Sequence, residues 1–149
     1  KKRSVSILGK RIECTYVELG EPGIPHAVVE IPGLTAKDKE EVRAMGKAMR
    51  HYEGFPKGAN VNFYDVIDND NVAVLTYERG VEDFTLACGT GSGAVVYVLT
   101  AQKAVSGDYV RVNVPGGELF ITVSDEGLYL TGPTAVIAEG TVNIKELIK

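Results

Sequence analysis

Cysteine, methionine and tryptophan are scarce in this sequence of 149 residues, which has two cysteines, two methionines and no tryptophan. Two cysteines, Cys14 and Cys88, are too few to build a disulfide scaffold, and they lack the paired spacing of a structural zinc site. We therefore treat each cysteine as a free thiol and predict no metal site.

Long apolar runs and an excess of positive charge are also absent. No stretch approaches the roughly 20 apolar residues that span a bilayer, and no signal-type apolar segment follows the first four residues. The 16 Lys and Arg against 20 Asp and Glu give a net charge of -4, which argues against nucleic acid as the main ligand. These absences predict a soluble, cytoplasmic protein that binds neither nucleic acid nor membrane.

The composition is that of a folded domain. Apolar residues make up 44% of the chain and charged residues 24%, a balance that buries a core and excludes a disordered or collagen-like chain. The length predicts a single domain over residues 1–149. Because the chain begins at Lys1 and not at Met, we also hypothesise that it is a piece of a longer translation product.

Runs of β-branched and aromatic residues predict an α+β domain with two helices. Val42 and Met45 fall at helical spacing after Thr35, a good N-cap residue, which predicts an outer helix over about 35–51. Residues 94–105 are apolar nearly all round, which predicts a buried central helix with sheet wrapped about it and leaves a strand as the alternative. Strands are expected over residues 4–8, 12–19, 26–31, 61–67, 72–77, 109–114, 118–123, 128–130 and 134–137.

Strand periodicity separates two faces of the predicted strand 61–67. Val61, Phe63 and Ile67 fall on one face, while the other face holds Asn60, Asn62 and Tyr64. The face with the two asparagines is the one that could meet a polar ligand.

Cys88 stands at the start of a glycine-rich stretch, with three glycines in the five residues that follow it. Glycines let the backbone curl closely about a ligand, and the predicted helix begins directly afterwards. The N–H groups and positive dipole end of a helix N-terminus stabilise a thiolate and hold a carboxylate or phosphate. We predict a reactive cysteine beside an anion pocket, and the alternative is a buried, inert cysteine on a helix cap.

A dinucleotide fingerprint is a competing interpretation of the same glycines. Gly89, Gly91 and Ala94 match G-x-G-x-x-A, with Asp108 near the expected distance for the ribose-binding acid. That fingerprint opens a βαβ unit whose acid ends the second strand. Here Asp108 precedes its strand and a hairpin follows, so this interpretation is disfavoured.

Glu78 and Arg79 lie side by side at the end of a predicted strand, ten residues before Cys88. They form either an ordinary surface ion pair or a substrate clamp, in which Arg79 grips a carboxylate and Glu78 orients an ammonium group. His26 enters a strand from a turn, and nothing local decides its role. We assign no role to His51.

Four stretches match, in order, the second half of the diaminopimelate epimerase family, and more distantly the proline racemase group. They are GIPHAVV at 23–29, FPKGANVNF at 55–63, TYERGVE at 76–82 and TLACGTG at 85–91. The chain therefore resembles the C-terminal half of a two-half epimerase whose N-terminal half is absent. The resemblance implies a β-barrel-like sheet round a central helix in each half, with the active site between them.

The resemblance also implies a cofactor-independent isomerase that converts LL- to meso-diaminopimelate in lysine biosynthesis. One cysteine thiolate removes the α-proton, and a second thiol returns a proton to the opposite face. Cys88 would be the thiol of this half, with Glu78 and His26 as further catalytic residues. Implied substrate contacts are Asn60, Glu78, Arg79 and the backbone N–H groups of Gly89 and Thr90.

Two departures from the family pattern bear on function. The first half's Cys-Gly-Asn-Gly element is absent, and Cys14 cannot replace it because it lies in a strand without a glycine loop. Ile24 stands where the family commonly has Asn, which leaves the substrate open. We expect the isolated chain to be inactive. The alternatives are a non-catalytic amino-acid- or carboxylate-binding module, an isomerase of another substrate, or a homodimer that faces its two Cys88 thiols across an interface.

Overall fold

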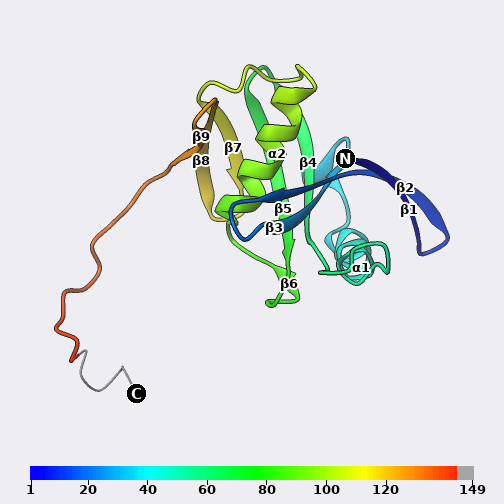
Figure 1. Ribbon diagram of the computed structural model, residues 1–149, viewed down its shortest axis with the longest axis horizontal. Coiled ribbons are helices and arrows are strands. Elements are labelled where there is room, and N and C mark those ends of the chain that lie inside the picture. Colours follow the sequence, from blue (N-terminus) through cyan, green and yellow to red (C-terminus); the bar gives the residue numbers. More distant parts are fainter. Residues whose placement is uncertain (144–149) are drawn as a thin grey trace.

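The computed structural model describes residues 1–143, which form a mixed α+β fold of nine strands in one sheet and two α-helices (Figure 1). The strands run in the spatial order β1-β2-β3-β4-β5-β7-β8-β9, and β6 pairs with β5. The elements are β1 (Lys2–Ile7), β2 (Lys10–Leu19), β3 (Ile24–Glu30), α1 (Lys39–Arg50), β4 (Asn60–Asp68), β5 (Asn71–Glu78), β6 (Asp83–Phe84), α2 (Gly89–Ala101), β7 (Val110–Val114), β8 (Gly117–Ser124) and β9 (Gly127–Thr131).

Antiparallel hairpins join β1 to β2, β4 to β5 and β7 to β8, as the turn residues between the predicted strands indicate. Two pairs are parallel, β3 with β4 and β5 with β7. Parallel neighbours need a long crossover, and the two crossovers contain α1 and α2. The two helices are therefore placed by the two parallel pairings.

The sheet separates two apolar cores, because neighbouring residues of a strand point to opposite faces. Val61 and Phe63 of β4 pack in the core that includes Val42 and Met49 of α1. Tyr64 of β4 packs in the second core, which is built round α2. The predicted separation of the two faces is confirmed for residues 60–64, and the face with Asn60 and Asn62 is the one that α2 covers. Ile67, predicted on the face of Phe63, is instead 52% exposed, because the pairing with β5 shifts register between Val66 and Asp68.

The helix α2 lies against the middle of the sheet (Figure 1) and contacts β2, β3, β4, β5, β8 and β9. Its Ala94, Val95 and Val96 side chains are buried, whereas Tyr97 is 45% exposed. The strand alternative for this segment is wrong, and the helix starts at Gly89, five residues before the predicted start. Within the described residues the sheet is open, with β1 and β9 as its edges.

Three further features differ from the sequence prediction. α1 begins at Lys39, because the Asp38 carboxylate accepts from the Glu40 N–H at 2.9 Å and caps the helix, so Thr35 is not its cap. The strand β6 has only two residues, too few to produce a periodic pattern. Residues 134–137, predicted as a strand, form none.

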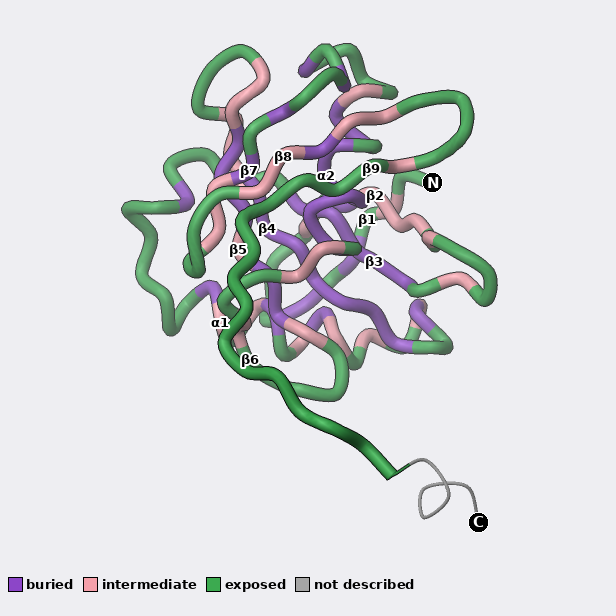
Figure 2. Tube along the Cα trace, turned by 90° about the vertical axis from the view of Figure 1, so that its left-hand side faces the viewer, coloured by how far each residue is buried: buried purple, intermediate pink, exposed green. Residues whose placement is uncertain are grey.

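The chain after β9 runs away from the body without secondary structure as far as residue 143 (Figures 1 and 2). Its apolar side chains are unpacked: Val136 is 83% exposed and Ile137 is 95% exposed. A strand needs a neighbouring strand to satisfy its backbone, and this segment has none among the described residues. Over residues 1–143 no helix combines the length and apolarity needed to cross a bilayer.

Candidate functional site

The residues predicted for the site converge at one end of the sheet. His26 lies near the start of β3 and pairs in register with Asn60, the first residue of the parallel strand β4. The antiparallel strand β5 ends beside them at Glu78, and Arg79 follows. Residues as far apart in the sequence as His26 and Arg79 therefore lie at the same end of the sheet, because β3, β4 and β5 are neighbours.

Cys88 is the N-cap residue of α2, so the predicted position of this thiol at a helix N-terminus is correct. Its side chain is partly exposed and makes no capping hydrogen bond. Sγ lies 3.7 Å from the Thr90 hydroxyl. The first N–H groups of the helix, including those of Gly89 and Thr90, have no partner within the helix and are free to bind an anion.

Gly91 brings the first turn of α2 into close contact with the sheet. A Cβ atom at this position would lie 2.3 Å from Asn62 Oδ1 and 3.1 Å from both Thr76 Oγ1 and Cys88 Sγ. No side chain fits there without displacing these groups. Glycine at this position therefore sets the distance between the thiol and the polar side chains of β4 and β5.

His26 is fully buried on the face of the sheet that carries these side chains. Its Nδ1 lies 3.2 Å from Asn62 Nδ2, and Asn62 Oδ1 accepts from the Thr76 hydroxyl at 3.0 Å. Burial, helped by the positive charge of Arg79, lowers the pKa of His26 to about 4, so the ring is neutral near pH 7. Nε2 has no partner within residues 1–143, and leaving such a donor unpaired costs about 1–3 kcal/mol unless a ligand satisfies it.

Asn60 and Arg79 are linked through the backbone. The Arg79 N–H donates to Asn60 Oδ1 at 2.8 Å, while Asn60 Nδ2 donates to the Pro25 carbonyl at 3.4 Å. The Arg79 guanidinium donates to the Lys57 carbonyl at 2.8 Å through Nη1. Within residues 1–143 Arg79 and Glu78 do not form the ion pair that was the alternative interpretation, and the Glu78 carboxylate makes no hydrogen bond.

Sequence reasoning assigned no role to Asn62, Thr76 or Gly91, although all three lie at the site. Asn62 carried a signal, since it falls on the predicted polar face with Asn60. Gly91 belongs to the glycine-rich stretch after Cys88, but its close approach to β4 and β5 is visible only in the structure. Thr76 carried no signal of its own, because its role follows from its contact with Asn62.

An open groove of about 1030 Å³ borders the N-terminus of α2. Gly89 and Thr90 form part of its wall, and Ile24 lies at its edge towards β3. Most of the groove is apolar, and its large side chains are exposed: Tyr97 is 45% exposed and Leu130 is 55% exposed. An exposed apolar surface of this kind is typical of a protein interface.

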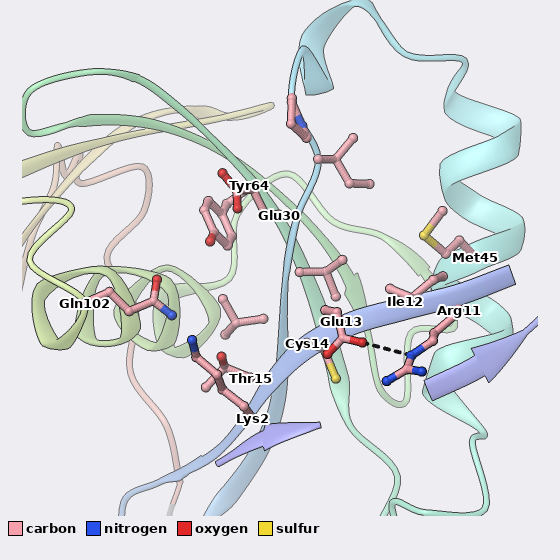
Figure 3. A pocket seen from close by; sticks show the side chains of 14 residues that line it. Lys2, Arg11, Ile12, Glu13, Cys14, Thr15, Glu30, Met45, Tyr64 and Gln102 are labelled. Carbon is pink, nitrogen blue, oxygen red and sulfur yellow. Dashed lines mark hydrogen bonds and ion pairs between the residues drawn. The ribbon is translucent and has the colours of Figure 1, made fainter. Parts of the chain in front are cut away.

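Cys14 lies in a different pocket of about 590 Å³, between the β1–β2 hairpin and the ends of β3 and α2 (Figure 3). Arg11 and Glu13 form an ion pair at its rim with a distance of 3.2 Å. Burial raises the pKa of the Cys14 thiol to about 11, so it stays protonated at neutral pH. The residues that line this pocket include none of those described above round Cys88 and none that line the groove beside α2, so Cys14 has no part in that site.

The donor set of the site does not suit a metal. Across the part of the chain that the structure describes, no three His, Cys, Asp or Glu side chains come together as ligands. The groups that converge are one thiol, one buried neutral imidazole, amides, a guanidinium and free backbone N–H groups. Groups of these types can hold an anionic, polar small molecule and can move protons.

Comparison with known proteins gives consistent matches. The sequence profile of the family described as diaminopimelate epimerase matches residues 20–137. A diaminopimelate epimerase of Chlorobaculum tepidum is 38% identical over 136 residues, which cover 88% of this chain and 50% of that protein. One from Archaeoglobus fulgidus is 38% identical over 125 residues, which cover 84% of this chain and 42% of that protein. The chain thus spans about half the length of the curated relatives it matches.

Solved structures share the fold at low sequence identity. A phenazine biosynthesis protein of the PhzF family from Enterococcus faecalis has a TM-score of 0.57 at 18% identity, covering 72% of this chain and 37% of that chain. A PhzC/PhzF protein from Clostridium difficile has a TM-score of 0.53 at 16% identity, covering 69% of this chain and 35% of that chain. At this level of identity the likeness concerns the fold alone.

Proposed function

Because the chain belongs to the diaminopimelate epimerase family, we propose that it is the C-terminal half of a cofactor-independent epimerase of lysine biosynthesis in the cytoplasm. The reaction is the conversion of LL- to meso-diaminopimelate, to which this half contributes the Cys88 thiol. The observation that carries the proposal is the position of Cys88 at the N-terminus of α2. Its thiol is partly exposed and makes no capping hydrogen bond, and the free N–H groups of the first helical turn lie beside it.

The chemistry requires two acid-base groups on opposite faces of the substrate. A thiolate takes the α-proton, so that the Cα–H bond breaks and an S–H bond forms, and the electron pair moves towards the carboxylate. A second thiol then protonates the opposite face of Cα and becomes the thiolate. A single base would return the proton to the face it came from, and the carbanion is too short-lived to wait for water.

Free N–H groups at the start of α2 stabilise the charge that develops during this step. In the proposal, Gly89 and Thr90 donate to the substrate α-carboxylate, which gains negative charge as the proton leaves. Gly91 keeps that carboxylate site close to the sulfur by letting the helix approach the sheet. These fixed dipoles take the place of an electron-withdrawing cofactor.

The remaining site residues bind the rest of the substrate. Glu78 has an uncommitted carboxylate and suits the distal ammonium group, while Arg79 keeps guanidinium N–H groups for the distal carboxylate. Asn60 contacts the substrate from the start of β4. His26, which pairs with Asn60 in the sheet, is a buried, neutral ring that influences the charge of the Cys88 thiol.

The second thiol comes from a partner, since Cys14 is buried in another pocket. In the proposal, the N-terminal half of the protein covers the apolar groove beside α2 and closes the site. The half-length match to the relatives supports this arrangement. The sheet of each half would then curve round its own central helix, which in this half is α2.

Reconstitution tests the proposal. The chain alone should not racemise diaminopimelate, and addition of a separately produced first half carrying its own cysteine should restore turnover. Cys88→Ser should abolish turnover, whereas Cys14→Ser, a matched change of the other thiol, should leave most of it. Robust racemisation by the isolated chain would contradict the two-thiol mechanism.

A carboxylate-binding module is the second candidate, favoured by the presence of only one accessible thiol and by Ile24 at the groove. Calorimetric titration with diaminopimelate stereoisomers separates the two candidates. Binding that is unchanged in Cys88→Ser, together with no turnover in any reconstituted form, would favour the module.

Sedimentation tests the homodimer hypothesis, because a chain that is monomeric at high concentration cannot face two Cys88 thiols across an interface.

A further inference from the structure

The orientation of the Asn62 side chain is fixed from both ends. Of its two polar atoms, Nδ2 can only donate a hydrogen bond and Oδ1 can only accept one. Nδ2 lies 3.4 Å from both the Ala27 and the Asn60 carbonyl oxygens, which can only accept. The Thr76 hydroxyl donates to Oδ1 over 3.0 Å. If the amide were flipped, Oδ1 would face the Ala27 and Asn60 carbonyl oxygens, and acceptor would meet acceptor at both contacts. Only the Thr76 hydroxyl, which can donate or accept, would tolerate the flip.

This orientation decides which nitrogen of His26 carries the proton. Asn62 Nδ2 faces His26 Nδ1 at 3.2 Å, and because Nδ2 offers only hydrogens, Nδ1 must accept through its lone pair. The ring is neutral, since burial and the charge of Arg79 lower its pKa to about 4. A neutral imidazole has one N–H, so the proton resides on Nε2.

We infer that Asn62, held by Thr76, is a positioning residue that fixes His26 as the neutral tautomer with its proton on Nε2. In this tautomer Nε2 donates and cannot accept, while the Nδ1 lone pair is occupied by Asn62. His26 therefore offers a hydrogen bond to an anionic group and is not the base that deprotonates Cys88. This catalytic consequence rests on the proposed function, whereas the tautomer itself does not.

The pair formed by Asn62 and Thr76 lies directly against the thiol-bearing turn of α2. Asn62 Oδ1, Thr76 Oγ1 and Cys88 Sγ all border the space that a side chain at Gly91 would occupy. Nε2 of His26 is buried and has no hydrogen-bond partner within residues 1–143. A buried donor kept unpaired in a polar site is available to a ligand or to the partner half.

Nitrogen NMR of histidine-labelled protein tests the assignment, because long-range proton couplings distinguish a protonated from an unprotonated ring nitrogen. The chain has two histidines, so His51→Gln leaves His26 as the sole signal. We expect Nε2 to be protonated and Nδ1 unprotonated at pH 7. A protonated Nδ1 in this otherwise unchanged chain would overturn the inference, whether or not any assembled form catalyses epimerisation.

Variants of Asn62 and Thr76 distinguish a role in positioning the His26 ring from a role in packing alone. Asn62→Asp keeps the shape of the side chain but offers only acceptors, so it should move the proton to Nδ1 and raise the pKa of the ring. Thr76→Val removes the hydroxyl that holds Oδ1 and should give a mixture of tautomers. The control is Ser92→Ala, since Ser92 is equally buried in α2 and its hydroxyl has no partner in the described chain.

We expect the His26 signals of Ser92→Ala to match those of the unsubstituted chain. An unchanged tautomer in folded Asn62→Asp would show that Asn62 does not position the ring. If Asn62→Asp fails to fold, the measurement on the His51→Gln chain still shows which ring nitrogen of His26 carries the proton.

Discussion

At the scale of single residues, the site depends on one glycine and on a few buried polar side chains. Gly91 permits a contact between helix and sheet that no other residue allows. His26 and Asn62 are fully buried and contact each other across two strands, and Asn62 also accepts a hydrogen bond from Thr76 on a third. Replacing such residues affects both stability and the geometry round Cys88, so the two effects must be measured separately.

Gly91→Ala should destabilise the protein, because its methyl group would overlap Asn62 Oδ1. Overpacking of this kind costs about 1–3 kcal/mol of unfolding free energy, more than the helix gains from alanine. Urea denaturation measures the change. Gly93→Ala is the matched control, since a Cβ there would meet only the ends of two leucine side chains, the nearer being Leu128 Cδ1 at 3.3 Å. Equal stability of the two variants would contradict the close packing at Gly91.

Stability should fall as the pH drops below about 6.5, because His26 has a pKa of about 4 in the folded chain against 6.5 when exposed. The unfolded state binds a proton in this range while the folded state does not, so acid favours unfolding. From pH 7 to pH 5 the loss from this group is about 2 kcal/mol.

Denaturation of the chain and of His26→Gln at both pH values isolates the contribution of His26. The carboxylates with lowered pKa values, such as Glu82, lose their contribution at lower pH in both proteins. The substituted protein should therefore show a much smaller decrease between pH 7 and pH 5. An equal decrease in both would mean that His26 titrates normally.

At the scale of secondary-structure elements, the two helices begin in different ways. α1 has a carboxylate cap from Asp38, acidic residues in its first turn and basic residues in its last turn. α2 has Cys88 as its N-cap residue, whose side chain makes no capping hydrogen bond, and it has no acidic residue in its first turn. The first helix is stabilised locally, whereas the second leaves its N–H groups available and depends on tertiary packing.

Asp38→Ala should destabilise α1 by about 1 kcal/mol through loss of its N-cap hydrogen bond. Asp38→Asn, which retains an acceptor, should lose much less. Thr35→Ala is the second comparison, since Thr35 lies in a separate 3₁₀ turn, Leu34–Ala36. Thermal denaturation of the three variants measures these differences, and a larger effect at Thr35 than at Asp38 would contradict the observed cap.

At the scale of the whole molecule, exposed apolar side chains lie together in two regions of the described chain. One is the groove beside α2, and the other is the segment after β9, where Val136 and Ile137 are almost fully exposed. The sheet is open at β1 and β9 within the described residues. Together with the half-length match to the curated relatives, these features support a partner that covers the groove.

Leu130→Lys should weaken assembly with a separately produced first half, because Leu130 lies in the groove and is 55% exposed. Leu8→Lys is the control, since Leu8 is 62% exposed but lies at the β1–β2 turn outside the groove. Calorimetric titration should give roughly a tenfold or larger loss of affinity for the first variant only, as expected from about 1.4 kcal/mol or more. Equal affinities would place the interface elsewhere.

Local patterns in the sequence were sufficient to predict the α+β class, the presence of both helices, the main hairpins and the position of Cys88 at a helix start. These features depend on residue periodicity, turn residues and glycine spacing, which act between neighbours in the chain. The same patterns predicted a strand at 134–137, where the structure has none. β propensity is present there, but among the described residues no neighbouring strand completes the backbone hydrogen bonds.

Only the tertiary structure decided how the polar side chains of the site contact one another. Asn62 contacts His26, which is 36 residues away in the sequence, and Thr76, which is 14 residues away. These contacts form because β3 pairs parallel with β4, and β5 pairs antiparallel with β4, each in one particular register. A shift of one residue would turn these side chains to the other face of the sheet. The sequence by itself determined which groups are present, and the strand register determined which of them share hydrogen bonds.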